Sequence, residues 1–216
     1  MEETIYKKYS LLEPLNVSRE TFEDFERFIS LIVEKNKEIN MISKETSINE
    51  IIRERHIIDS AQAIDFVDLT NNTTSDLGSG AGLPGIVMAI MMKNSKIDMK
   101  LNLYEKSYHK SLFLKDVSRE LNLDTEVIQD NIFLSKELNS GTIMARAFKP
   151  LPIVLDLVNK NFNSYKNLIL FMGKKGKEVL KETLNEWNFD YEEKKSLTSE
   201  NSFLLNIKNI SKRNLN

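Results

Sequence analysis

The glycine-rich segment from Ser75 to Gly85 has the clearest chemical character in the chain. It holds four of the seven glycines among 216 residues. Because glycine lacks a Cβ atom, it adopts positive φ angles and lets a ligand approach the main chain. The apolar run from Ile86 to Met92 is compatible with a helix, and Pro84 suits the first turn of that helix. The segment therefore predicts a strand, a tight turn and a helix around a ligand.

Two cofactors fit this turn. Over residues 80–85 the spacing G-x-G-x-x-G matches the dinucleotide fingerprint, and Glu105 follows about 20 residues later, where an acid binds ribose. Over residues 76–82 the spacing D-x-G-x-G-x-G is typical of methyltransferases that use S-adenosylmethionine (SAM). Asp76 favours SAM, because its carboxylate can accept from an ammonium group, directly or through water, and would repel a pyrophosphate.

The composition excludes several kinds of site. The chain has no cysteine, which rules out disulfides, thiolate zinc sites and the covalent route to methylation of pyrimidine carbon five. The two histidines, His56 and His109, argue against a histidine-based metal site, so we expect no metal. Since the net charge is −2, contact with RNA must come from a local basic patch.

Targeting signals are not evident in the sequence. Met1-Glu2-Glu3 is acidic, no apolar run follows it, and the longest apolar run (Ile86 to Met92) is too short to span a membrane. We therefore expect a cytoplasmic protein without a membrane partner, and a monomer.

The helices and strands that must position the candidate site residues can be predicted from the spacing of apolar residues and from capping residues. Ser18 is the expected cap of an amphipathic helix that ends near Asn36, and residues 47–50 form a capping box for a further helix. From Thr73 onward strands and helices alternate, which is typical of a mostly parallel sheet with helices on both faces. We expect an α/β, Rossmann-like fold of the SAM-dependent methyltransferase type. Its expected parts are an N-terminal helical cap (residues 1–68) and a SAM-binding domain (residues 69–216).

The later elements are less regular. A short helical segment is expected over residues 133–138, and a helix over residues 176–187. Residues 190–195 and 202–207 are expected to close the sheet as an antiparallel pair.

Ligands of such sheets lie beyond the carboxyl ends of the strands. Glu105 and Arg146 follow or end two of these strands, and Lys174 and Lys175 follow another. Arg146 can hold the substrate, the cofactor or a carboxylate, and the lysines can hold phosphates or merely solvate a helix start. The sequence after Arg146 lacks the (Asp/Asn/Ser)-Pro-Pro-(Tyr/Phe) motif typical of enzymes that methylate exocyclic amines, which argues against that acceptor.

Four stretches together resemble a known family. They are residues 36–43 (NKEINMIS), 55–60 (RHIIDS), 76–85 (DLGSGAGLPG) and 145–148 (ARAF). The chain from about residue 20 to 208 resembles the bacterial 16S ribosomal RNA guanine methyltransferases of the RsmG/GidB type, which methylate ring nitrogen seven of one guanine.

The resemblance and the turn together imply a set of cofactor contacts, with Arg146 also the expected catalytic residue beside the guanine. The expected contacts are Asp76, Gly78, Gly80, Leu83, Glu105, Ile132, Phe133 and Arg146. At Ile132 and Phe133 the sequence departs from the family, which has a basic residue, a small residue and two acids there. A backbone contact to adenine survives that change, whereas a side-chain contact does not.

The expected RNA contacts are Asn40, His56, Lys174 and Lys175. For His56 the alternative is a residue that ties the helical cap to the sheet. Nitrogen seven of guanine has an in-plane lone pair and no proton to lose, so its methylation needs alignment more than a general base. The sequence therefore predicts SAM-dependent methylation of this nitrogen in 16S ribosomal RNA, free or in the small subunit. A catalytically silent RNA- or ribosome-binding module and an NAD-dependent oxidoreductase are the alternatives.

Overall fold

A computed structural model describes residues 2–213, and of residues 2–4 only the backbone is considered. Residue 1 and residues 214–216, the outer ends of the two expected domains, lie outside the described residues.

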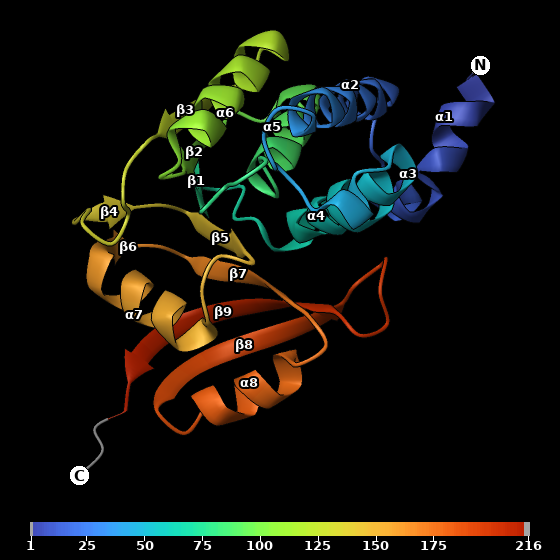
Figure 1. Ribbon diagram of the computed structural model, residues 1–216. Helices are drawn as coiled ribbons and strands as arrows, with labels where there is room; N and C mark the ends of the chain where they lie inside the picture. Colours follow the sequence, from blue (N-terminus) through green and yellow to red (C-terminus); the bar gives the residue numbers. More distant parts are fainter. Residues whose placement is uncertain (1, 214–216) are drawn as a thin grey trace.

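A seven-stranded sheet with strand order β3-β2-β1-β5-β7-β9-β8 forms the centre of the molecule (Figure 1). Neighbouring strands from β3 to β7 pair in parallel, whereas β9 is antiparallel to both β7 and β8. This arrangement confirms the mostly parallel α/β sheet and its antiparallel closing pair. The strands are β1 (Thr73–Leu77), β2 (Lys100–Tyr104), β3 (Thr125–Ile128), β5 (Thr142–Arg146), β7 (Asn167–Met172), β8 (Trp187–Lys195) and β9 (Phe203–Lys212).

Helices cover both faces of the sheet because strand side chains alternate between the faces. On β7, Ile169 packs with the core on the side of α5, whereas Leu168 and Leu170 pack with the core on the side of α7. The helices of the first side include α5 (Gly85–Asn94) and α6 (Tyr108–Glu120), and those of the second are α7 (Leu151–Asn161) and α8 (Gly176–Thr183). The expected helix over residues 176–187 therefore ends earlier, and its last residue, the buried Trp187, instead begins β8.

Helix α5 is buried on all sides, which explains its uninterrupted apolar sequence. It lies between the sheet and α2 (Arg19–Asn36), and every residue from Gly85 to Met92 is buried. A helix that is apolar all round is stable only in such a position. Ser18 caps α2 as expected, since its side chain accepts from the amide of Thr21 at 3.4 Å.

The second helical segment of the cap differs from its prediction. It consists of α3 (Asn49–Ile52), a π-helical stretch (Arg53–Ile58), α4 (Asp59–Ala61) and a 3₁₀ stretch (Gln62–Phe66). The predicted capping box is wrong, because Ile48 is the N-cap residue and the hydroxyl of Ser47 instead donates to the carbonyl of Lys44 at 2.8 Å. The remaining cap helices are α1 (Glu2–Lys8) and the 3₁₀ stretches Ser10–Leu15 and Lys44–Thr46.

The predicted helical segment over residues 133–138 is also wrong. The chain there forms turns and then β4 (Leu138–Asn139), which pairs with β6 (Phe162–Ser164) in a separate two-stranded sheet. The side chain of Asn131 accepts from the amide of Phe133 at 3.3 Å, and such local bonds compete with helix formation.

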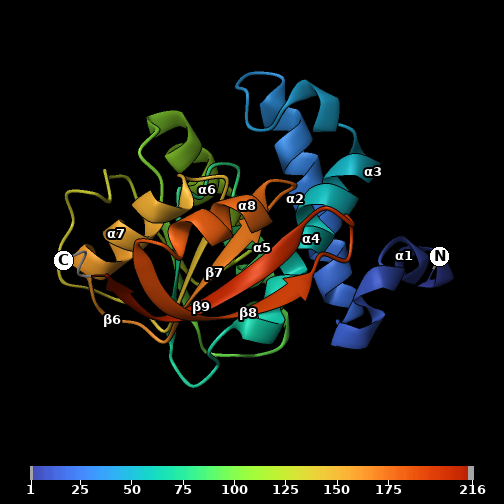
Figure 2. The same ribbon diagram turned by 90° about the horizontal axis from the view of Figure 1, so that it is seen from below.

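The hairpin of β8 and β9 extends to the helical cap and meets it at α4 (Figure 2). Within residues 2–213, no helix combines the length and the apolar character that crossing a membrane requires.

Candidate functional site

A cavity of about 550 Å³ lies at the carboxyl ends of the parallel strands. Its walls come from the turns after β1, β2, β3 and β5 and from the helical cap. The lining segments are Gly78–Ala81 with Leu83, Tyr104–Lys106 with Lys110, Asp130–Phe133, Arg146–Lys149, and Met41, Ile42 and His56 of the cap.

The glycine turn after β1 forms one wall. Gly78, Gly80 and Gly82 have φ angles of 72°, 57° and 90°, which residues with a Cβ atom rarely adopt. At Gly78 a Cβ atom would also lie 2.3 Å from Cδ2 of Phe148. The amide of Gly78 donates to the carbonyl of Tyr104 at 2.9 Å, which joins the turn to the end of β2. At Gly78 and Gly80 the turn therefore exposes backbone rather than side chains to the cavity.

Glu105 joins this turn to the start of α6. Its side chain is nearly buried and lines the cavity. One carboxylate oxygen accepts from the amide of Gly80 at 2.9 Å, and the other accepts from the amide of Ser107 at 2.8 Å. Because each carboxylate oxygen can accept two hydrogen bonds, Glu105 keeps capacity for a pair of hydroxyl groups.

Asp76 lies beneath the turn and does not line the cavity. It is completely buried, and its Oδ2 atom accepts from the amide of Gly85 at 2.9 Å. Its Oδ1 atom has no hydrogen-bond partner among the described residues. Burial, reinforced by the charge of Glu105, raises the pKa of Asp76 to about 7. In this geometry Asp76 holds the first residue of α5 by a hydrogen bond from below the cavity.

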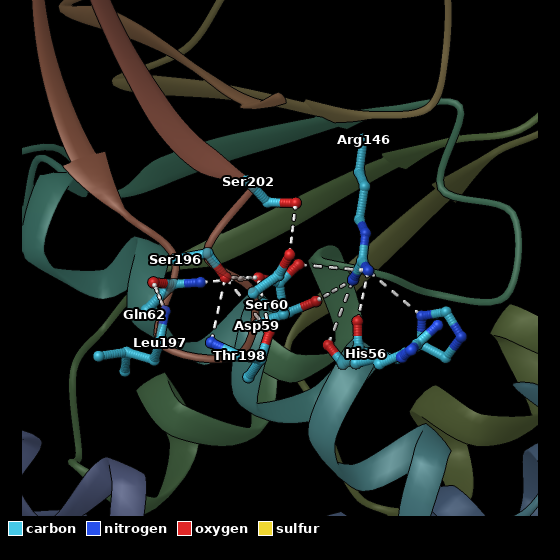
Figure 3. A network of polar contacts seen from close by, with 11 residues as sticks. His56, Asp59, Ser60, Gln62, Arg146, Ser196, Leu197, Thr198 and Ser202 are labelled. Atoms are coloured by element: carbon cyan, nitrogen blue, oxygen red, sulfur yellow. Dashed lines mark hydrogen bonds and ion pairs between the residues drawn. The ribbon is translucent and has the colours of Figure 1, made fainter. Parts of the chain in front are cut away.

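Arg146 ends β5, and both of its terminal nitrogens contact the helical cap (Figure 3). Nη1 lies 3.3 Å from the carbonyl oxygen of His56 and 3.2 Å from the hydroxyl of Ser60. Nη2 donates to the carbonyl of Arg55 and lies 3.2 Å from Oδ2 of Asp59. The two carbonyls belong to the π-helical stretch, a distortion that often occurs at functional sites. Arg146 therefore joins the cap to the sheet at the edge of the cavity.

The protonation of His56 follows from this contact. Its Nδ1 atom lies 3.3 Å from Nη2 of Arg146, and a guanidinium group can only donate. Nδ1 must therefore accept, which puts the proton of the neutral ring on Nε2. Burial, followed by the charges of Arg146 and Arg55, lowers the pKa of His56 to about 4. His56 thus carries an uncharged Nε2–H donor that has no partner among the described residues.

Apolar side chains line the part of the cavity beyond β3. Ile132 is buried and Phe133 is partly exposed, and the ring of Phe133 stacks on that of Phe148 with centroids 6.0 Å apart. Together with Leu83 they offer apolar contact without a charge.

The structure brings most of the predicted site residues to this cavity, but not all of them. Gly78, Gly80, Leu83, Glu105, Ile132, Phe133, Arg146 and His56 line it. Asn40 does not line it, although its neighbours Met41 and Ile42 do. Lys174 and Lys175 line a second, adjacent cavity.

Several lining residues were missed by reasoning from the sequence. Phe148 and Lys149 lie two and three residues after Arg146, and that proximity in sequence was a usable signal. Met41 and Ile42 belong to the stretch 36–43 that carries the family resemblance, but neither was named as a site residue. Both of their amides are held by the side chain of Asn36, at 2.8 and 3.0 Å.

Comparison with known proteins gives consistent results. The family described as rRNA small subunit methyltransferase G matches residues 21–207. A relative from Pelagibacter ubique, named ribosomal RNA small subunit methyltransferase G, is 65% identical over 212 residues, which cover 98% of this chain and all of the relative. A relative of the same name from Ruegeria pomeroyi is 32% identical over 198 residues, covering 92% of this chain and 96% of the relative.

Two solved structures share the fold. A SAM-dependent methyltransferase from Aquifex aeolicus aligns with a TM-score of 0.52 at 12% identity, covering 70% of this chain and 89% of that one. The 16S rRNA methylase RmtB aligns with a TM-score of 0.52 at 11% identity, covering 89% of this chain and 75% of that one. At such identities these likenesses concern the fold alone, and they support the predicted Rossmann-like methyltransferase architecture. The sequence relationships go further: the chain belongs to the rRNA small subunit methyltransferase G (GidB) family, whose members are SAM-dependent methyltransferases.

Proposed function

We propose that the protein transfers the methyl group of SAM to ring nitrogen seven of a guanine in 16S ribosomal RNA. One observation carries the proposal: in a chain of this family, the glycine turn, the carboxylate of Glu105 and the end of β5 at Arg146 meet in a single cavity. The substrate class rests on the names of the relatives, which are called ribosomal RNA small subunit methyltransferases.

The residues of the cavity fit SAM. Glu105 would accept hydrogen bonds from the ribose hydroxyls, and the exposed backbone of Gly78 and Gly80 would lie against the cofactor. Leu83, Ile132 and Phe133 would contact adenosine through apolar surface, which requires no charged side chain. Asp76 would contribute from below the turn, where its unpaired Oδ1 would favour the positive charge of the bound cofactor. When bound, SAM supplies a methyl group activated by a positively charged sulfur.

The substrate side of the cavity suits a reaction without a general base. Guanine presents two neighbouring acceptors on one edge, nitrogen seven and oxygen six. The first must keep its lone pair for the methyl group, so donors of the protein should bind the second. His56 lines the cavity and carries an unpaired donor on Nε2, but this atom is buried, so the ring would have to move for Nε2–H to reach oxygen six. Because the ring is uncharged, it does not repel the sulfonium or the cationic 7-methylguanine product.

Arg146 would act as the catalytic residue beside cofactor and guanine. Its terminal nitrogens are held by the cap, whereas its Nε–H makes no hydrogen bond within the described residues. Asp59 offsets its positive charge, which lowers the repulsion that a free guanidinium would exert on the sulfonium.

RNA would approach from the cap and from the end of β7. Asn40 is exposed beside the lining residue Met41, and Lys174 and Lys175 are exposed beside the adjacent cavity.

We propose residues 1–68 as a cap on a SAM-binding domain of residues 69–216. We also propose that the protein acts as a monomer in the cytoplasm, where bacterial ribosomal RNA is made.

The test is transfer of a tritiated methyl group from SAM to small subunits, and to their purified RNA, from cells that lack this modification. Nucleoside mass spectrometry should find the label as 7-methylguanosine. Label in another nucleoside would contradict the proposed acceptor atom. Absence of label together with binding of RNA but not of SAM would instead favour a silent RNA-binding module, and binding of NAD in place of SAM would favour an oxidoreductase.

A further inference from the structure

A second cavity, of about 430 Å³, lies beside the first at the carboxyl ends of β5 and β7. Its lining includes Leu151 and Gly176, the first residues of α7 and α8; Figure 1 shows both helices beside β7 and β9. The segment Ala147–Lys149 lines both cavities and therefore forms the wall between them. The inner surface is apolar, and includes Leu151, Val154 and Leu170.

Three exposed lysines surround this apolar surface: Lys149, Lys174 and Lys175. None of them has an ion-pair or hydrogen-bond partner within residues 2–213, in contrast to Lys177, which pairs with Glu193. Among residues 5–213, no acidic side chain lines the cavity. The positive charges at its edge are therefore not neutralised by the protein itself, which favours an anionic ligand with an apolar or aromatic part.

We propose that this second cavity binds the unstacked base of a nucleotide adjacent to the target guanine, with the neighbouring phosphates on the three lysines. The inference rests on the function proposed above. An enzyme that acts on a base must take it out of the stack, which leaves the next base without one of its stacking partners. Apolar and aromatic side chains replace such stacking, and lysines hold the backbone phosphates. Phe148 and Phe171 supply aromatic surface here.

The shared wall supports this occupant over others. Two consecutive nucleotides are covalently linked, so their bases need binding sites that adjoin, as these two cavities do at Phe148. A second SAM molecule would need an acid for its ribose hydroxyls, and this cavity has none among its lining residues. An apolar side chain of a partner protein would leave the three lysines without counter-charges.

The test compares variants of the full-length protein on small-subunit RNA that the wild type methylates. Val179→Trp places a large side chain in the cavity from α8, where Val179 is partly buried. Since stacking of one base is worth roughly a five- to hundredfold change in affinity, KM for RNA should rise by a factor of that order. The dissociation constant of SAM, measured by calorimetry, should not change.

The lysines are tested separately, because these exposed substitutions should not disturb folding. The double variant Lys174→Ala with Lys175→Ala should flatten the slope of log affinity against log salt by about two, or about one per lost phosphate contact. Lys181→Ala is the control: it removes one nearby positive charge, from α8, but Lys181 does not line the cavity. It should leave the slope and the KM as in the wild type.

The outcomes separate this inference from the proposed function. Absence of 7-methylguanosine with the wild type would refute the function itself. If the wild type is active, an unchanged KM in Val179→Trp, or a lysine variant no different from Lys181→Ala, would overturn the inference. Loss of kcat at saturating RNA with an unchanged KM would also overturn it, because the cavity would then hold the target guanine.

Discussion

The contact between Asp59 and Arg146 allows a quantitative prediction for the substitution Asp59→Asn. Both side chains are largely buried, with 13% and 19% of their surface exposed. The other carboxylate oxygen of Asp59 accepts from Gln62 at 2.8 Å and from Ser196 at 2.9 Å, which joins the cap to the β8–β9 hairpin (Figure 3). An asparagine can keep those bonds through its amide oxygen. Its NH2 group then lies next to the guanidinium of Arg146, and since both groups are donors, no hydrogen bond forms between them.

The expected loss of stability in Asp59→Asn depends on the hydrogen-bond acceptors that Arg146 keeps. Breaking a buried ion pair by removing one partner costs about 3–5 kcal/mol. Arg146 keeps the carbonyls of Arg55 and His56 and the hydroxyl of Ser60 as neutral acceptors, so we expect the lower part of that range or less, about 2 kcal/mol. For a chain of this length that lowers Tm by roughly 4–8 °C.

A matched control exists on the same helical segment. Asp65 pairs with Lys194 of the hairpin, but 44% of its side chain is exposed, so Asp65→Asn should cost less than about 1 kcal/mol. Unfolding in urea can be followed through the single tryptophan, Trp187, which is buried in β8. Equal losses in the two variants, or a loss below about 0.5 kcal/mol in Asp59→Asn, would refute the assignment of this ion pair as a stabilising link between cap and sheet.

Three further predictions concern residues that line the cavity or lie beneath it. The pKa of Asp76 in the folded protein, about 7, lies above its value in the unfolded chain, so the folded state binds this proton more tightly. The stability that the bound proton contributes is therefore lost as pH rises from about 4 to 7. Relative to Asp76→Asn, the wild type should lose up to about 4 kcal/mol across that window in urea titrations, and parallel curves would contradict it. At pH 6 nitrogen-detected NMR should find His56 neutral with its proton on Nε2; an imidazolium signal would be inconsistent with the contact to Arg146. Glu105→Gln should weaken SAM binding at least tenfold in calorimetry, because the amide loses acceptor capacity for hydroxyl groups and must turn one donor toward Gly80 or Ser107; wild-type affinity would remove Glu105 from the cofactor site.

The fold and the position of the cavity at the glycine turn were predictable because their signals are local. Positive φ angles require glycine, so the turn at Gly78 is visible in the residue types themselves. Burial on one or both faces imposes a periodic pattern of apolar residues, so the predicted bounds of α2 and of the parallel strands lie close to the observed ones. Glu105 was predictable as well, since the acid at the end of the second strand of such a sheet lies next to the first turn.

Other features depended on contacts between distant parts of the chain. The expected capping box at Ser47 and the expected helix near Phe133 were wrong because side-chain bonds and packing prevailed over local propensity. The sequence placed Asp76 near the cofactor and Arg146 at the end of a strand. Only the tertiary structure buries Asp76 below the turn and holds both terminal nitrogens of Arg146 with residues 86 to 91 positions earlier in the chain.

The physical reason is the range of the interactions involved. Backbone conformation and hydrophobic periodicity are determined by neighbours along the chain, so the sequence by itself determined α2, the parallel strands and the chemistry of the glycine turn. Burial, hydrogen-bond partners and pKa depend on atoms that packing brings together. The uncharged state of His56, the brace formed by Asp76 and the second cavity beside Lys174 were therefore decided by the tertiary structure alone.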